Sequence, residues 1–150
     1  MKLPSEIRKR FMRYGRAGGK VRAARLSSEA RRATACRAAS SRWIRERFGA
    51  SSLAALGLPG GEIVDTGLAD LADGTVSAES LVVSLAAPRL RREGIPIGSV
   101  QTDPEDRLYD LLSRARGDLA HARYAAYLQQ IASFADACRV ARRRRAADAR

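Results

Sequence analysis

Arginine and lysine side chains crowd the first third of the chain at spacings that suit a polyanion. A guanidinium group matches the geometry of a phosphate and binds it through paired hydrogen bonds. We therefore predict nucleic-acid contacts from the cations of this segment, namely Arg8, Lys9, Arg13, Arg16, Lys20, Arg22, Arg25, Arg31, Arg32, Arg37 and Arg42. The alternative is a solvated basic surface without a ligand, although so many like charges repel one another in a compact segment.

The charge is divided into three blocks along the 150 residues. Residues 1–50 carry a net charge of +12, residues 51–138 a net charge of −5, and residues 139–150 a net charge of +5. This division predicts a basic helical arm for nucleic acid over 1–50, an acidic helical body for a partner over 51–138, and a basic helical tail over 139–150.

No residue set in the chain favours catalysis. The stretch 15–20, GRAGGK, is one residue short of a phosphate-binding loop, and Val21 stands where that motif needs Ser or Thr. His121 is the only histidine, and no triad or metal set forms around it. We therefore expect no enzyme, no cofactor and no metal.

Two groups in the body are candidates for contacts with a partner protein. The carboxylates Asp65, Asp70 and Asp73 lie among small residues and could meet a basic cleft, where they would raise the association rate. Solvated helix ends are the alternative. Tyr124 and Tyr127 concentrate apolar mass near the C-terminus, and they fit either the core or an interface.

The composition predicts an all-α protein, with the basic helical arm followed by a small body of about four helices. Alanine (28) and leucine (15) are abundant, whereas valine, isoleucine and threonine together number 17. The former favour helices and the latter favour strands. We expect the first helix to end near Tyr14 at a glycine hinge over 15–19, and Ser27 to begin a second helix that ends at Gly49. Asp103 and Asp118 are predicted to cap the last two helices.

The termini and the cysteines predict a cytoplasmic protein. Lys2 and three further cations follow the first residue with no apolar stretch, so no signal peptide is expected. The longest apolar run, near Leu81, is too short for a membrane span, and we expect no membrane contact. Cys36 and Cys138 are far apart in the sequence and are predicted to be buried, reduced thiols.

Two stretches resemble known proteins. Residues 15–43, GRAGGKVRAARLSSEARRATACRAASSRW, resemble a basic segment with a Gly-Gly-Lys and an Ala-Ala-x-x-Arg-Trp element in small uncharacterised bacterial proteins. Residues 103–135 look like the C-terminal helices of proteins loosely associated with toxin–antitoxin operons, often beside nucleotidyltransferase-type toxins. The resemblance implies an antitoxin-like protein, with a basic arm for operator DNA and a helical body that neutralises a toxin.

Three functions remain open from the sequence. The first is a non-enzymatic DNA-binding regulatory protein of antitoxin type. The second is a general nucleic-acid-binding protein, of nucleoid or RNA-associated type, without a dedicated protein partner. The third is a small structural or adaptor subunit whose basic ends meet an acidic neighbour.

Overall fold

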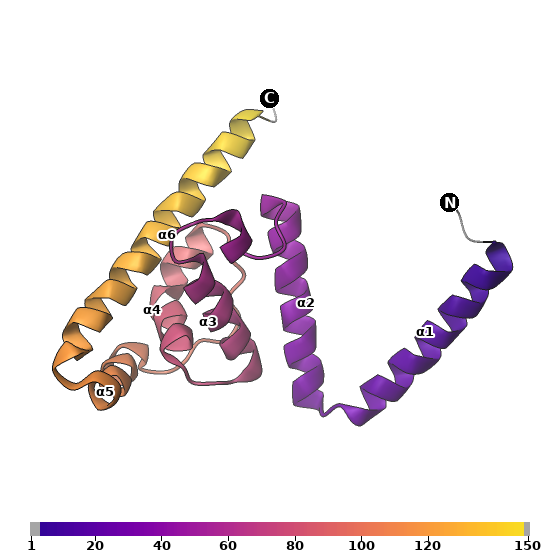
Figure 1. The fold of residues 1–150 in the computed structure, drawn as a ribbon, viewed down its shortest axis with the longest axis horizontal. Coiled ribbons are helices and arrows are strands. Elements are labelled where there is room, and N and C mark those ends of the chain that lie inside the picture. The colour runs from indigo at the N-terminus through magenta and orange to yellow at the C-terminus, as the bar shows by residue number, and fades with distance from the viewer. Residues whose placement is uncertain (1–3, 149–150) are drawn as a thin grey trace.

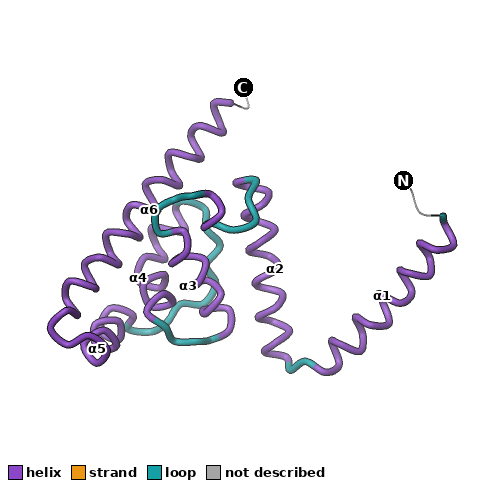
Figure 2. Tube along the Cα trace, in the orientation of Figure 1, coloured by secondary structure: helices purple, strands orange, loops and turns teal. Residues whose placement is uncertain are grey.

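The computed structural model describes residues 4–148, and within that range the chain is helical, without a strand. The predicted all-α class is confirmed. The helices run through the chain in the order α1 (Ser5–Arg25), α2 (Ser28–Phe48), the 3-10 helix η1 (Ala54–Leu56), α3 (Gly61–Asp73), α4 (Ala78–Arg92), α5 (Pro104–Arg116), the 3-10 helix η2 (Gly117–Leu119) and α6 (Ala120–Asp148). Figures 1 and 2 show α2 to α6 gathered together, while α1 leaves the lower end of α2 and points away.

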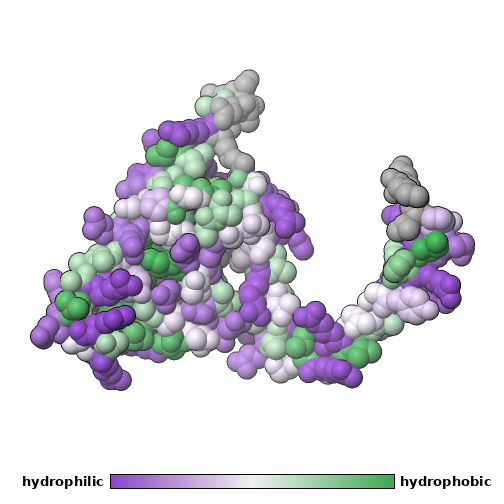
Figure 3. Space-filling view, in the orientation of Figure 1, coloured by the Kyte–Doolittle hydropathy of each residue, from purple (hydrophilic) through white to green (hydrophobic). Residues whose placement is uncertain are grey.

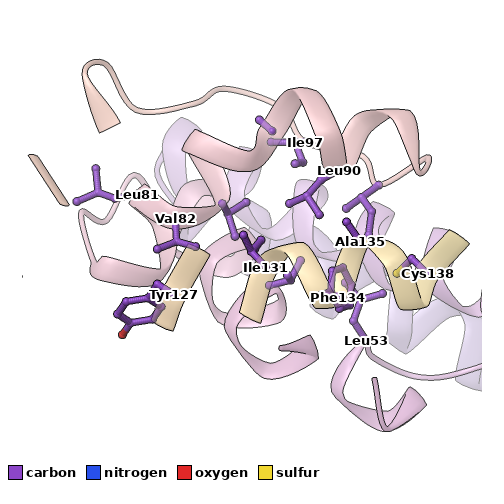
Figure 4. Packing of buried hydrophobic residues seen from close by; sticks show 14 of the residues in the cluster. Leu53, Leu81, Val82, Leu90, Ile97, Tyr127, Ile131, Phe134, Ala135 and Cys138 are labelled. Carbon is purple, nitrogen blue, oxygen red and sulfur yellow. The ribbon is translucent and has the colours of Figure 1, made fainter. Parts of the chain in front are cut away.

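The hydrophobic core is built around α4, which packs against α3, α5 and α6. Leu81, Val82 and Leu90 of α4 are fully buried. The long helix α6 crosses this group, and Figure 4 shows its side chains Ile131 and Phe134 pointing into the same cluster. The core therefore brings together segments that are far apart in the sequence.

The carboxyl end of α2 belongs to this same core. Ile44 and Phe48 are buried in the cluster that also contains Leu53 and Val64. Trp43 packs edge-on against Phe48, with 5.4 Å between the ring centroids. The predicted boundary at residue 50, between the arm and the body, thus lies inside one hydrophobic cluster. The last two turns of α2 pack on the body.

Several helices begin at a serine cap or end at a glycine, as the sequence predicts. Ser27 accepts a hydrogen bond from the Ala30 N–H at 3.1 Å, as an N-cap should. Ser77 and Ser80 form a reciprocal capping box at the start of α4. Gly49 ends α2 with a φ of 73°, a left-handed conformation that costs glycine little.

The predicted glycine hinge over 15–19 is wrong. α1 continues through these glycines as one helix of 21 residues that ends at Arg25, and the backbone of the next residue, Leu26, is extended (φ −90°, ψ 138°). The helix passes through because glycine lowers helix propensity by only about 1 kcal/mol per residue relative to alanine and does not block the hydrogen bonds. The change of direction therefore comes at the junction before Ser27.

Three further predictions are corrected. Asp103 stands at the start of α5 with a φ of 45°, but its side chain makes no capping hydrogen bond. Asp118 lies inside η2 and does not cap α6, because the chain turns through this 3-10 segment before the α-helix begins at Ala120. Cys36 is exposed, contrary to the prediction, whereas Cys138 is buried as predicted.

Candidate nucleic-acid interface

Helix α1 holds more Lys and Arg residues than any other helix and stands clear of the body. None of its residues is buried, and in Figure 3 its surface is separated from the rest of the molecule. The helix carries eight Lys and Arg residues and one acid, Glu6. Glu6 forms an ion pair with Lys9 at 3.3 Å, but both side chains are highly exposed, so this pair holds Lys9 only weakly.

Four of the predicted cations form one row along α1. Lys9, Arg13, Arg16 and Lys20 follow one another at intervals of four, three and four residues. Residues at these intervals share one face of an α-helix. We call these four residues the cationic row. The remaining predicted cations of α1, Arg8, Arg22 and Arg25, lie on other parts of the helix surface and are exposed.

A row of apolar side chains occupies another face of the same helix. Ile7, Phe11, Tyr14 and Val21 are spaced by four, three and seven residues, with Gly18 completing the repeat. At about 100° per residue, this apolar row lies roughly 150° around the helix axis from the cationic row. The sequence interpretation missed it because a break at Gly15 separates Val21 from the rest. The alternating intervals of four and three residues from Ile7 to Val21 could have indicated this row from the sequence.

The predicted cations of α2 divide between solvent and the body. Arg31, Arg32 and Arg42 are exposed. Arg37 instead donates a hydrogen bond to the Oδ2 atom of Asp73 in α3, at 2.9 Å. The guanidinium of Arg37 is therefore already paired with a carboxylate.

The basic end of α6 contacts the end of α4. Arg142 donates a hydrogen bond of 3.3 Å to the backbone carbonyl of Arg92, and its guanidinium lies 3.7 Å from Glu93. Asp136 pairs with both Arg89 and Arg139. Part of the predicted tail thus makes contacts with the body. Its last two residues, 149–150, lie outside the described range.

The three candidate carboxylates of the body make internal contacts. Asp65 accepts hydrogen bonds from the backbone N–H groups of Leu53 (3.1 Å) and Ala54 (2.8 Å), which holds the loop before η1. Asp70 accepts a hydrogen bond from the hydroxyl of Ser77, the residue that caps α4. With Asp73 paired to α2, each of the three has a structural role, and their contact with a partner stays a prediction.

The two candidate tyrosines also face carboxylates. The hydroxyl of Tyr127 donates to Glu79 at 3.1 Å, and the hydroxyl of Tyr124 donates to Glu105 at 3.0 Å. Burial is the main cause that raises the pKa of each phenol, and the neighbouring carboxylate adds to it. Tyr127 is buried in the core cluster, with its hydroxyl turned outward in Figure 4.

A hollow of about 500 Å³ lies beside Tyr127, between the start of α3 and α6. Arg123 covers the tyrosine ring, with its guanidinium carbon 5.1 Å from the ring centroid. Glu62 and Glu79 line the same hollow. The mixture of charges selects neither an anion nor a cation, so the hollow indicates no particular ligand.

In residues 4–148, no group of three or more metal-binding side chains comes together. Over the same residues, no helix combines the length and the apolar character that crossing a bilayer requires. His121 is exposed. Comparison with known protein families, with curated proteins and with solved structures finds no match to this chain.

Proposed function

We propose that this chain is a non-enzymatic nucleic-acid-binding protein whose helices α1 and α2 contact the phosphate backbone. The observation that carries the proposal is the cationic row of α1, which is exposed along its whole length. At a rise of 1.5 Å per residue the row is about 16 Å long, which matches the axial rise of roughly five base pairs of duplex DNA. Arg31, Arg32 and Arg42 of α2 would continue the contact along a second helix.

The finer proposal is a DNA-binding regulator of antitoxin type. The resemblance of residues 15–43 and 103–135 supports it, and so does the division of labour in the fold. The body has its own hydrophobic core and does not need α1 for it. In this proposal α1 and α2 hold operator DNA, and the protein also binds a partner, for which a nucleotidyltransferase-type toxin is the candidate.

Fluorescence anisotropy with a labelled duplex DNA, repeated over a series of salt concentrations, tests the contact. Each phosphate neutralised by the protein contributes about 0.9 to the slope of log K against log salt. The variant Arg13→Gln/Arg16→Gln should therefore weaken binding and lower that slope by about 2. The matched control is Arg114→Gln/Arg116→Gln, which removes the same charge from exposed positions of α5. Equal losses from both variants would contradict a contact through α1.

A second comparison separates a regulator from a general binder. The protein is titrated against the DNA that precedes its own gene and against a shuffled duplex of equal length. A regulator should prefer the first by about a thousandfold or more. A ratio near one would instead leave a general polyanion-binding protein, since phosphate contacts carry affinity without sequence information.

A further inference from the structure

The apolar row of α1 lacks a partner within residues 4–148. The exposed fraction of its side chains is 43% for Ile7, 66% for Phe11, 64% for Tyr14 and 53% for Val21. Phosphate contacts by the cationic row would leave these side chains in water, because they lie on another face of the helix. The nucleic-acid contact therefore does not explain them.

Helix α1 also needs more stabilisation than its contacts within residues 4–148 supply. Its interior contains Gly15, Gly18 and Gly19, each of which costs about 1 kcal/mol relative to alanine in a helix. Its eight cations against one acid add repulsion. Most helical stability in proteins comes from packing of an apolar face, yet α1 buries none of its residues. Within residues 4–148 nothing supplies that packing, so we infer that a surface beyond these residues does.

The shape of the apolar row indicates a groove. The row spans about 80° of the helix surface, at about 100° per residue, whereas a helix that lies on a flat bilayer presents a broad apolar face. Arg10 borders the row on one side and Arg22 on the other, and Arg25 continues its line. A narrow row of anchors with charged borders is how an amphipathic helix fits the groove of another protein.

The same borders argue against a second copy of this chain. If two α1 helices met through their apolar rows, Arg10 and Arg22 would occupy the flanking positions whose charges set pairing in helix dimers. Those charges would repel across the seam, and Arg25 would be placed within it. Carboxylates on the rim of a groove would instead attract all three guanidinium groups.

We propose that the apolar row of α1 docks into an apolar groove, rimmed by acidic side chains, on a different protein. Phe11 and Tyr14, the two aromatic side chains of the row, are its main anchors, as aromatic residues are in many interfaces. This places the partner contact on α1 and not on Asp65, Asp70 or Asp73. It goes beyond the proposed nucleic-acid contact and does not depend on it, since the two use different faces of the helix.

Ca²⁺-loaded calmodulin is a suitable probe, because it has methionine-rich apolar grooves and binds basic amphipathic helices. We expect the full chain to bind it with a micromolar or lower Kd, and Phe11→Ala/Tyr14→Ala to weaken binding at least tenfold. Met12→Ala is the matched control, since Met12 is 51% exposed but lies outside the row. Its affinity should change less than twofold.

Four measurements on the same variants, namely calmodulin binding, sedimentation equilibrium, vesicle binding and duplex binding, decide between the possible occupants of the row. No binding to calmodulin, or equal losses from Met12→Ala and Phe11→Ala/Tyr14→Ala, would overturn the proposal. So would a wild-type dimer in sedimentation equilibrium that Phe11→Ala/Tyr14→Ala dissociates, or binding to phosphatidylglycerol vesicles that this variant alone abolishes. Duplex binding should be unchanged in Phe11→Ala/Tyr14→Ala, and a tenfold loss there would assign the row to nucleic acid instead.

Discussion

Arg37 on α2 and Asp73 at the end of α3 form an ion pair, with 2.9 Å between the guanidinium nitrogen and the carboxylate oxygen. The sequence assigned the first residue to nucleic acid and the second to a partner protein. In the fold they neutralise each other and fasten the middle of α2 to the body. Both side chains are substantially exposed, so the pair contributes modestly to stability.

Removal of this pair should have a small and measurable effect. We expect Arg37→Ala to lower the free energy of unfolding by about 0.2–1 kcal/mol, the range for exposed ion pairs, and less at high salt. Urea unfolding followed by circular dichroism measures it. Arg31→Ala, at an exposed position of the same helix, should cause no loss, and a loss equal to that of Arg37→Ala would refute the role of the pair.

Two phenylalanines should respond in opposite ways to truncation. Phe134 is fully buried beside α4, so Phe134→Ala should cost about 3–5 kcal/mol of unfolding free energy. Phe11→Ala, on the exposed row of α1, should stay within about 0.5 kcal/mol of the native value. Thermal and urea unfolding of the two variants make the comparison. A similar loss in both would mean that α1 packs on the body in solution.

Gly67 lies where α3 packs tightly against α4. A Cβ atom at this position would lie 2.5 Å from the backbone oxygen of Glu79 and 2.5 Å from a methyl group of Val83. Gly67→Ala should therefore cost about 1–3 kcal/mol, the range for overpacking. Gly15→Ala meets open space and should raise the helix content of α1 without loss of stability. Denaturation midpoints for both variants test the contrast, and a neutral Gly67→Ala would rule out the tight crossing.

Asp65 should behave as a structural residue. Its carboxylate receives two backbone N–H groups from Leu53 and Ala54, and its removal leaves both without their acceptor. We expect Asp65→Ala to lower the unfolding free energy by about 1–2 kcal/mol, as the loss of a helix cap does, and Asp65→Asn to lose less because its amide oxygen still accepts. Hydrogen exchange of the Leu53 and Ala54 amides gives a local readout. Unchanged exchange in Asp65→Ala would contradict this role.

The two cysteines should differ sharply in reactivity. Burial, together with the nearby charge of Glu93, raises the pKa of the Cys138 thiol to about 12. At pH 8 its thiolate fraction is therefore roughly one part in ten thousand. Iodoacetamide should add one label, on the exposed Cys36, to the native protein and two labels in urea, as read by intact mass. Rapid labelling of both in the native state would show that the C-terminal part of α6 opens.

The raised pKa of the Cys138 thiol also makes the stability of the fold depend on pH. Because the thiol ionises less readily in the folded chain, the unfolded chain loses its proton first as the pH rises. The contribution of Cys138 to the free energy of unfolding is therefore fully present below about pH 9, and it is lost as the pH rises toward 12. Cys138→Ala should flatten this part of the stability profile.

The fold class and most helix ends could be predicted because their causes are local. Ser27 and Ser77 cap helices through residues three positions away, and Gly49 supplies the left-handed turn at a stop. Asp103 and Asp118 failed as caps although their residue type favours that role. Their backbone conformation is set by the turns that join α4, α5 and α6, which a local pattern does not contain.

The candidate site was predictable in composition but not in arrangement. The cations of α1 were evident from charge alone, whereas their order as one row depends on the helix continuing beyond Gly15. The role of Asp65 depends on a loop twelve residues earlier folding against α3. Such contacts are fixed by tertiary packing, so a single sequence reveals the carboxylate but not what it holds.

The order of the helices in the chain also affects how the protein folds during and after synthesis. Neighbouring helices pack on one another, α3 on α4, α4 on α5 and α5 on α6, which gives a low contact order and favours rapid folding. Yet α6 supplies Phe134 and Cys138 to the core, so the body is complete only when the last helix has left the ribosome. Because α1 precedes the body in the chain, it leaves the ribosome earlier, and its cations and apolar row are exposed before the body that carries them has formed.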